Sequence, residues 1–156
     1  MEEEEEEWFK KGGEVEVSLE EEGFRGSWYT ATVLRRVSKK NYKMLVEFKN
    51  LTADEEGTKP LRQFVEAILA RPVPPRELNR SFKLSDEVDA FHNDGWWEGI
   101  VTAVYPMEEQ RQDSSTRRYS VFFRSSREQI DFPQSDLRLH REWFHGKWVP
   151  PLEQEE

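Results

Sequence analysis

Two similar stretches constrain the fold of this chain more than any other feature of the sequence. They read Gly-Ser-Trp-Tyr-Thr-Ala-Thr-Val at Gly26–Val33 and Gly-Trp-Trp-Glu-Gly-Ile-Val at Gly95–Val101. Each places two adjacent aromatic residues at a glycine-containing turn and continues into small and β-branched residues. Adjacent residues on a strand point to opposite faces, so one ring of each pair can join a core while the other stands on the outer surface. We expect Trp28 and Trp96 as the core rings, and Tyr29 and Trp97 as their surface partners.

The similarity extends to the segments around these stretches. Phe9–Val17 matches Phe82–Ala90 in step, and a late arginine recurs as Arg71 and Arg138. An internal repeat of about 65–70 residues indicates a tandem array of two β-units. We place the first unit at residues 8–75 and the second at residues 80–151, because the proline-rich stretch Arg71–Pro75 cannot continue a strand ladder.

The alternation of residues predicts short strands in both units. Val15 and Val17 alternate with Glu14 and Glu16, which is typical of a half-buried strand. The other expected elements are strands at Trp28–Val37, Asn41–Phe48 and Tyr119–Phe123, a short strand and turn of helix over Leu61–Leu69, loops at Leu51–Pro60 and Tyr105–Arg118, and a closing segment over Phe132–Leu139. Arg141–Pro151, with Trp143 and Trp148, has no counterpart in the first unit, and we expect it to seal the interface between the units.

Charge is concentrated at the two ends of the chain. The formal net charge is −9, and six acids at Glu2–Glu7 and three at Glu153, Glu155 and Glu156 account for it, since the rest balances 23 acidic against 23 basic residues. Such like-charge runs are typical of disordered, solvated tails, so we expect tails at residues 1–7 and 152–156. A second reading is a tether that attracts a basic ligand. Neither favours nucleic acid, whose binding needs clustered Lys and Arg.

The residues described so far resemble the plant Agenet domain. The two aromatic stretches, each preceded by Glu-Val-Glu or Glu-Val-Asp, and the closing run from Asp136 to Pro151 carry this resemblance. Agenet domains belong to the Tudor-like Royal group of strongly bent β-barrels, which often read methylated lysine or arginine. The resemblance implies an all-β fold of two such barrels in tandem, packed on each other, and covers nearly all of residues 8–151. The tandem pair also resembles the plant multi-Agenet heterochromatin readers of histone H3 dimethylated at lysine-9.

By this resemblance the ligand site is an aromatic cage in the second unit. A methylammonium retains its charge but loses hydration, so the negative faces of aromatic rings bind it best, at about 0.5–2 kcal/mol per contact. Tudor-type cages draw one ring each from the end of strand one, the start of strand two and the end of strand three. We assign these places to Phe91, Trp97 and Phe123. Asp94 or Glu98 supplies the carboxylate that accepts the remaining N–H of a dimethyl-lysine.

The same places in the first unit hold Ser18, Tyr29 and Phe48, so one wall is missing there. We therefore keep Tyr29 and Phe48 as a secondary cage candidate only. The first unit instead offers carboxylates for unmodified basic residues of a histone tail, and Asp131 adds one from the second unit. The expected basic-peptide contacts are Glu14, Glu16, Glu20, Glu21, Glu22 and Asp131. A histone peptide bound in the groove between the two barrels could place its methylated lysine in the cage of the second unit and its unmodified basic residues against these carboxylates.

Three classes of function follow. The resemblance implies a nuclear reader of the H3 tail, linked to heterochromatin and gene silencing and acting as a monomer. The alternatives are a module for an unmodified or methyl-arginine peptide, and an RNA- or DNA-binding module. Cysteine is absent, the three histidines lack metal-ligand spacing, and no catalytic or phosphate-binding motif is present. We therefore expect no enzymatic activity, no metal, no cofactor and no membrane partner.

Overall fold

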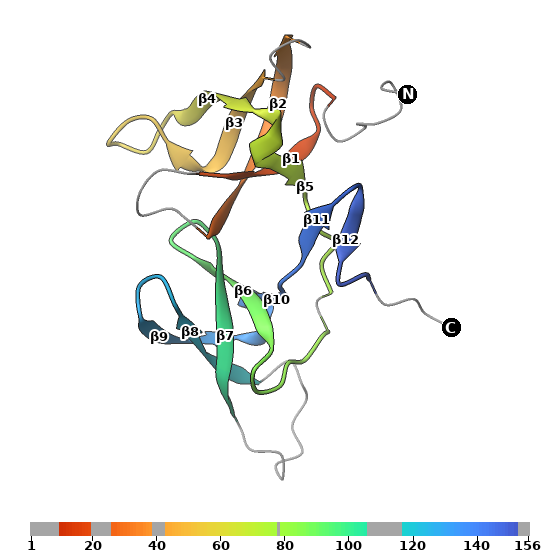
Figure 1. The fold of residues 1–156 in the computed structure, drawn as a ribbon. Helices are drawn as coiled ribbons and strands as arrows, with labels where there is room; N and C mark the ends of the chain where they lie inside the picture. The colour runs from red at the N-terminus through yellow and green to blue at the C-terminus, as the bar shows by residue number, and fades with distance from the viewer. Residues whose placement is uncertain (1–9, 20–25, 39–42, 78, 106–116, 153–156) are drawn as a thin grey trace. The chain divides into compact units, whose positions relative to one another are not determined.

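The chain divides into two compact units, Met1–Val73 and Pro74–Glu156, in the computed structural model described here. The structure describes residues 10–19, 26–38, 43–77, 79–105 and 117–152. Both acidic tails fall largely outside these ranges, as do Glu20, Glu21 and Glu22, so the expectations for them are not tested by the structure. Each unit is built almost wholly from antiparallel strands (Figure 1).

The first unit curls five strands into a bent barrel. The strands are β1 (Glu14–Ser18), β2 (Ser27–Ser38), β3 (Lys43–Thr52), β4 (Pro60–Glu66) and β5 (Ala70–Pro72). β2 pairs with β1 and β3, β3 pairs with β4, and β5 returns to pair with the free side of β1. A 3-10 turn, η3 (Ala67–Leu69), makes this return, which confirms the strand and helical turn expected over Leu61–Leu69.

The second unit repeats this arrangement. Its strands are β6 (Glu87–His92), β7 (Gly95–Tyr105), β8 (Arg118–Phe123), β9 (Glu128–Pro133) and β10 (Leu137–Leu139), with the 3-10 turn η5 (Gln134–Asp136) before β10. β10 pairs with β6 just as β5 pairs with β1. The expected all-β fold with two Tudor-like barrels in tandem is confirmed. A further hairpin, β11 (Glu142–Phe144) and β12 (Lys147–Val149), lies in the segment that has no counterpart in the first unit.

Matching bulges bend the long second strand of each unit. The pairing register shifts between Val33 and Arg35 on β2 and between Val101 and Ala103 on β7. A β-bulge adds a residue to one strand, which bends that strand and increases its twist. Because Val33 and Val101 occupy equivalent places in the repeat, both barrels curl at the same point.

The core of each unit shows which ring of the aromatic pair faces inward. Tyr29 is 2 % exposed and alternates with the buried Ala31 and Val33, while Trp28 lies on the opposite face of β2. The expectation that Tyr29 stands on the outer surface is therefore wrong. The inward side of β2 is set by Val33, and counting back in steps of two reaches the second ring of the pair rather than the first.

The same correction applies to the second unit. Trp97 packs against the core cluster that contains Val101, whereas Trp96 is on the other face of β7. Trp96 is nonetheless buried, at 8 % exposure, because arginine side chains cover it. The core cluster of this unit comprises Phe82, Val88, Ala90, Val101, Tyr119, Val121, Phe123, Phe132 and Leu137.

Candidate functional site

Three rings from three strands meet at one end of the second barrel. His92 on β6 stacks on Phe123 of β8, with ring centroids 6.0 Å apart and planes 16° from parallel. Phe132 of β9 meets both of them edge-on, with centroids 5.9 Å from His92 and 5.9 Å from Phe123. Trp97 packs against the core cluster that includes Phe123 and Phe132, and it is partly exposed. We call His92, Phe123, Phe132 and Trp97 the ring cluster.

A two-residue turn holds one edge of the ring cluster in place. Asn93 and Asp94 connect β6 to β7, and their φ angles are 52° and 69°. Such left-handed angles at both central residues define the hairpin turn that matches the twist of the strands, and Asn and Asp tolerate them better than most residues. Asp94, whose side chain is exposed, therefore belongs to the turn that joins the strand end carrying His92 to the strand carrying Trp97.

The structure brings together only part of the expected cage. Trp97 and Phe123 lie on the inner face, where Phe123 is a core residue at 4 % exposure, but the ring of Phe91 packs against Trp96 on the opposite face of the sheet, with centroids 5.3 Å apart. The reason is strand alternation, since Val88 and Ala90 are buried in the core and the next inward position is His92. His92 was missed because it is not usually counted among cage aromatics, although the alternation of β6 would have identified it.

Glu98 also lies away from the ring cluster. It alternates with Trp97 along β7, and its carboxylate is 3.7 Å from Nε2 of His140. Of the two expected carboxylates, only Asp94 is therefore on the turn beside the rings.

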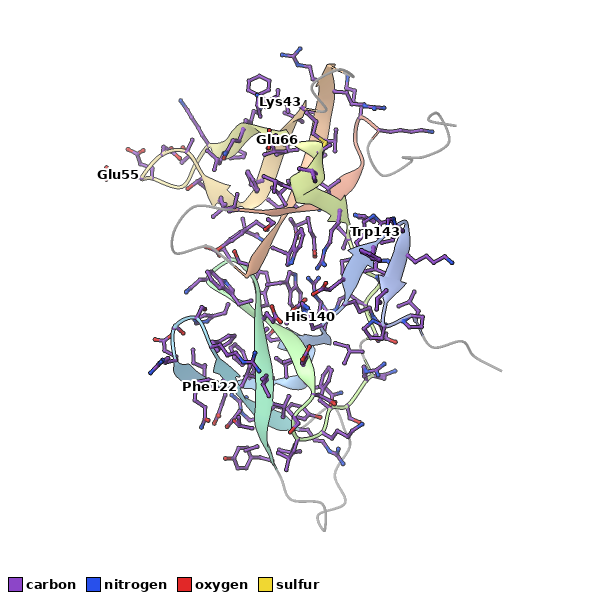
Figure 2. The ribbon with its side chains drawn as sticks, viewed as in Figure 1. Lys43, Glu55, Glu66, Phe122, His140 and Trp143 are labelled. Carbon is purple, nitrogen blue, oxygen red and sulfur yellow. The ribbon has the colours of Figure 1, made fainter. Side chains whose placement is uncertain are left out.

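The opposite face of the second unit holds a buried ion pair beneath a tryptophan. Asp89 is 1 % exposed, and Nε of Arg138 donates to its Oδ2 at 2.9 Å. The guanidinium of Arg138 lies over the ring of Trp96, 4.2 Å from its centroid. Nδ1 of His140 is 2.8 Å from the other oxygen of Asp89, and Figure 2 labels His140 where the chain passes from β10 to β11.

These contacts shift two pKa values in opposite directions. Burial opposes the charged form of His140, but the hydrogen bond and negative charge of Asp89, helped by Glu98 and Glu142, outweigh it and raise the pKa of His140 to about 9. Burial would likewise raise the pKa of Asp89, but the hydrogen bond from His140 and the charge of Arg138 overcome that effect, and the pKa is lowered. The pair is therefore ionised at neutral pH.

The first unit contains the same arrangement. Glu16 is fully buried, and Nη2 and Nε of Arg71 donate to its Oε1 at 2.9 and 3.2 Å. The guanidinium of Arg71 lies 3.8 Å from the ring centroid of Trp28. We call this repeated arrangement, Glu16–Arg71–Trp28 and Asp89–Arg138–Trp96, the strand clasp, because it joins the first, second and last strands of each barrel.

The strand clasp changes the expected basic-peptide contacts. Glu16 was expected to bind a basic residue of a ligand, and its burial against Arg71 makes that wrong. Glu14 is exposed and pairs with Lys49, while Asp131 is exposed and accepts a hydrogen bond from the hydroxyl of Ser120. Glu14 and Asp131 remain accessible to a ligand, and their role as contacts stays a prediction.

The first unit has smaller side chains where the second has the ring cluster. The repeat aligns Leu19 with His92, Phe48 with Phe123 and Val65 with Phe132. A groove of ≈ 340 Å³ opens at this place, lined by Val17, Ser18, Leu19, Gln63, Phe64, Val65, Glu66 and Leu69. Phe48 is 1 % exposed and Tyr29 is 2 % exposed, so the two rings of the secondary cage candidate are core residues here. Figure 2 labels Glu66 beside Lys43, its partner across β3 and β4.

Within the described ranges, no group of three or more His, Asp or Glu side chains has the arrangement of a metal site. The described part of the chain also contains no helix long and apolar enough to cross a membrane.

Comparison with known proteins finds the same tandem β-fold in solved structures of Agenet domains. The family profile described as Agenet domain matches residues 12–75. The crystal structure of Arabidopsis thaliana AGDP1 AGD34 superposes with a TM-score of 0.77 at 36 % identity, covering 90 % of this chain and 88 % of that one. The crystal structure of the ADCP1 tandem Agenet domain 3-4 superposes with a TM-score of 0.74 at 34 % identity, covering 93 % and 89 % of the two chains.

Relatives among curated proteins are considerably longer. The Arabidopsis thaliana protein AGENET DOMAIN (AGD)-CONTAINING P1 is 46 % identical over 96 % of this chain, which spans only 28 % of that protein. DUF724 domain-containing protein 3 from the same plant is 36 % identical over 88 % of this chain, which spans 19 % of it.

Proposed function

The chain belongs to the Agenet family, and we propose that it reads a methylated lysine of the histone H3 tail through the ring cluster of its second unit. Tandem Agenet domains are protein-interaction modules and not enzymes. Recognition of a histone tail would place the protein in the nucleus and would link it to heterochromatin and gene silencing. Dimethylated lysine-9 is the mark that we propose.

One observation carries the proposal: two partly exposed rings, Trp97 and His92, lie near the strand ends that the turn of the exposed Asp94 joins. Phe123 of β8 stacks on His92 but is itself only 4 % exposed, so it supports the ring of His92 from the core side. Several ring faces together attract a weakly hydrated cation, at about 0.5–2 kcal/mol each. A dimethyl-lysine keeps one N–H, which Asp94 can accept, whereas a trimethyl-lysine has none.

The charge of the chain supports a basic partner. The formal net charge of −9 attracts a histone tail and repels the phosphates of nucleic acid. Among the described carboxylates, Glu14, Asp131 and Asp94 are exposed. They can bind the unmodified Lys and Arg residues that flank the methylated one.

The test compares Trp97→Ala with the unaltered chain on two H3 peptides, one dimethylated at lysine-9 and one unmodified. Loss of a central aromatic contact should weaken binding of the methylated peptide by about 2 kcal/mol, a factor of about 30. Binding of the unmodified peptide should change little. Isothermal titration calorimetry gives both affinities, and circular dichroism checks that each variant is folded.

Phe144→Ala is the matched control, because Phe144 is an aromatic residue 62 % exposed on β11 and is not in the ring cluster. It should leave both affinities unchanged. If the unaltered chain binds the two peptides equally, the chain does not read lysine methylation. If a folded Trp97→Ala keeps the full preference for the methylated peptide, the cage lies elsewhere in the chain.

A further inference from the structure

We infer that the first unit binds an unmodified arginine of its peptide ligand on the ring of Trp28, on the outer face of β2. In the second unit the equivalent ring, Trp96, already carries such an arginine from the chain itself, Arg76. The choice of a histone tail as the ligand rests on the proposed function, whereas the arginine site rests on a comparison of the two units.

The ring of Trp96 in the second unit has three partners. The guanidinium carbons of Arg138 and Arg76 lie 4.2 and 5.0 Å from its centroid, and Phe91 packs edge-on with ring centroids 5.3 Å apart. Nη2 of Arg76 also donates to the carbonyl oxygen of Ser135 at 2.9 Å. With these partners in place, Trp96 is only 8 % exposed.

The ring of Trp28 in the first unit has only one of these partners. The guanidinium of Arg71 lies 3.8 Å from its centroid, and in the described part of the chain no second cation and no other ring contacts it. The strand partner of Trp28 is Ser18, which aligns with Phe91, the strand partner of Trp96. A serine is too small to cover an indole ring, and Trp28 is partly exposed.

The sequence has no arginine of its own for this place. Arg76 precedes Phe82 by six residues, and the residue six positions before the matching Phe9 is Glu3, within the acidic run. The guanidinium that would complete the first unit as Arg76 completes the second must therefore come from another molecule.

The backbone acceptor for such a guanidinium recurs in the first unit, but the carboxylate does not. The carbonyl of Ile68, in η3, has the same place in the repeat as that of Ser135 in η5, and Ile68 is 86 % exposed. Leu69 takes the place of Asp136, whose negative charge favours the charged form of Arg76. A guanidinium is weakly hydrated and stacks on rings, whereas the ammonium of lysine is compact and strongly hydrated, so a ring and a carbonyl without a carboxylate favour arginine.

The test uses two H3 peptides that are both dimethylated at lysine-9. One has its natural arginines, and in the other every arginine is replaced by lysine, which keeps the charge of the peptide. The unaltered chain should bind the arginine peptide more tightly by a factor of about 2–30, which corresponds to one cation–π contact. Isothermal titration calorimetry gives both affinities.

Two variants of Ser18 show whether this preference comes from Trp28. Ser18→Phe gives the first unit the ring that the second unit has as Phe91, so Trp28 should be covered and the two peptides should bind equally. Ser18→Ala is the matched control, because it leaves the ring accessible and should keep the full preference for arginine. Circular dichroism checks that each variant is folded, and if Ser18→Phe is not, Ser18→Leu takes its place.

A third peptide, with natural arginines and unmodified lysine-9, separates this inference from the proposed function. The preference for the dimethylated peptide should be the same in Ser18→Phe as in the unaltered chain, because the ring cluster belongs to the second unit.

Equal binding of the arginine and lysine peptides by the unaltered chain overturns the inference, and so does a folded Ser18→Phe that keeps the preference for arginine. Either result leaves the methyl-lysine site intact as long as the dimethylated peptide still binds more tightly than the unmodified one. A chain that ignores methylation but loses its arginine preference in Ser18→Phe refutes the proposed function and supports the arginine site.

Discussion

At the scale of single residues, Asp89 illustrates how one short carboxylate can serve two cations. Its two oxygens contact Arg138 and His140 separately, whereas in the first unit Nε and Nη2 of Arg71 reach the same oxygen of the longer Glu16. Asp89 thus holds a histidine as well as an arginine. It also places a positively charged histidine beside the exposed carboxylates of Glu98 and Glu142.

The stability of the second unit should depend on pH through His140. The pKa of His140 is about 9 in the folded chain and about 6.5 when unfolded. A raised pKa in the folded state means that protonation favours folding, so the stabilisation is complete below about pH 6.5 and is lost as pH rises through about 9. His140→Gln should therefore destabilise the chain more at pH 6 than at pH 10, as measured by urea unfolding.

His145→Asn is the comparison for this experiment, because it removes a histidine that is exposed. It should show the same small effect at both pH values. A destabilisation by His140→Gln that is equal at pH 6 and pH 10 would mean that the charge of His140 contributes nothing to stability.

At the scale of strands, alternation explains both what the sequence predicted and where it misled. The internal repeat correctly aligned the sequence of β1 with that of β6 and the sequence of β2 with that of β7, since Glu16 matches Asp89 and Val33 matches Val101. The wrong prediction came from taking the first aromatic residue of each pair as the inward one. The inward face is defined instead by Val33 on β2 and Val101 on β7. The same one-residue slip placed Phe91 in the cage instead of His92, because on a strand every such slip changes the face.

Other parts of the site were beyond the reach of sequence patterns. The ion pair of Glu16 with Arg71 joins residues 55 positions apart in the chain, and the sequence showed only that both recur in the repeat. The extension of β3 to Thr52 was missed because its last residues, Lys49–Thr52, are polar or half-exposed. The hairpin of β11 and β12 was missed because each strand has only three residues.

Gly99 on β7 should tolerate no side chain. A Cβ at this position would lie 2.5 Å from Cγ1 of Val121 and 2.9 Å from the carbonyl oxygen of Phe122, on the neighbouring strand β8. Since the backbone oxygen cannot move without distorting the ladder, Gly99→Ala should destabilise the second unit by about 1–3 kcal/mol. Urea unfolding followed by tryptophan fluorescence provides the measurement.

Ser125→Ala, in the exposed turn between β8 and β9, is the control, and it should change stability by less than about 0.5 kcal/mol. If Gly99→Ala proves as stable as the unaltered chain, the two strands must be able to separate locally by more than the structure indicates.

At the scale of the whole molecule, charge decides between the remaining classes of ligand. The chain has 32 acidic and 23 basic residues, and within each unit an arginine is buried in a strand clasp and is not available to phosphates. We therefore expect no binding to duplex DNA or single-stranded RNA at physiological salt, as measured by fluorescence anisotropy. The H3 peptide serves as the positive control under the same conditions.

Binding to nucleic acid that weakens steeply as salt is added would contradict this expectation, because release of counterions from phosphates is its characteristic signature. Binding through a ring cluster instead depends on methylation and changes far less with salt, since cation–π contacts act at short range.

The strand clasp has a consequence for how such tandem domains diverge after duplication. It closes each barrel through three residues on the face opposite the inner rings, and it is present in both copies, with Glu in the first and Asp in the second. The inner positions at the strand ends differ, with Leu19 and Val65 in the first copy and His92 and Phe132 in the second. Because the residues that close the barrel and the residues proposed to bind the ligand lie on separate faces, substitutions can change what one copy binds without destabilising its barrel.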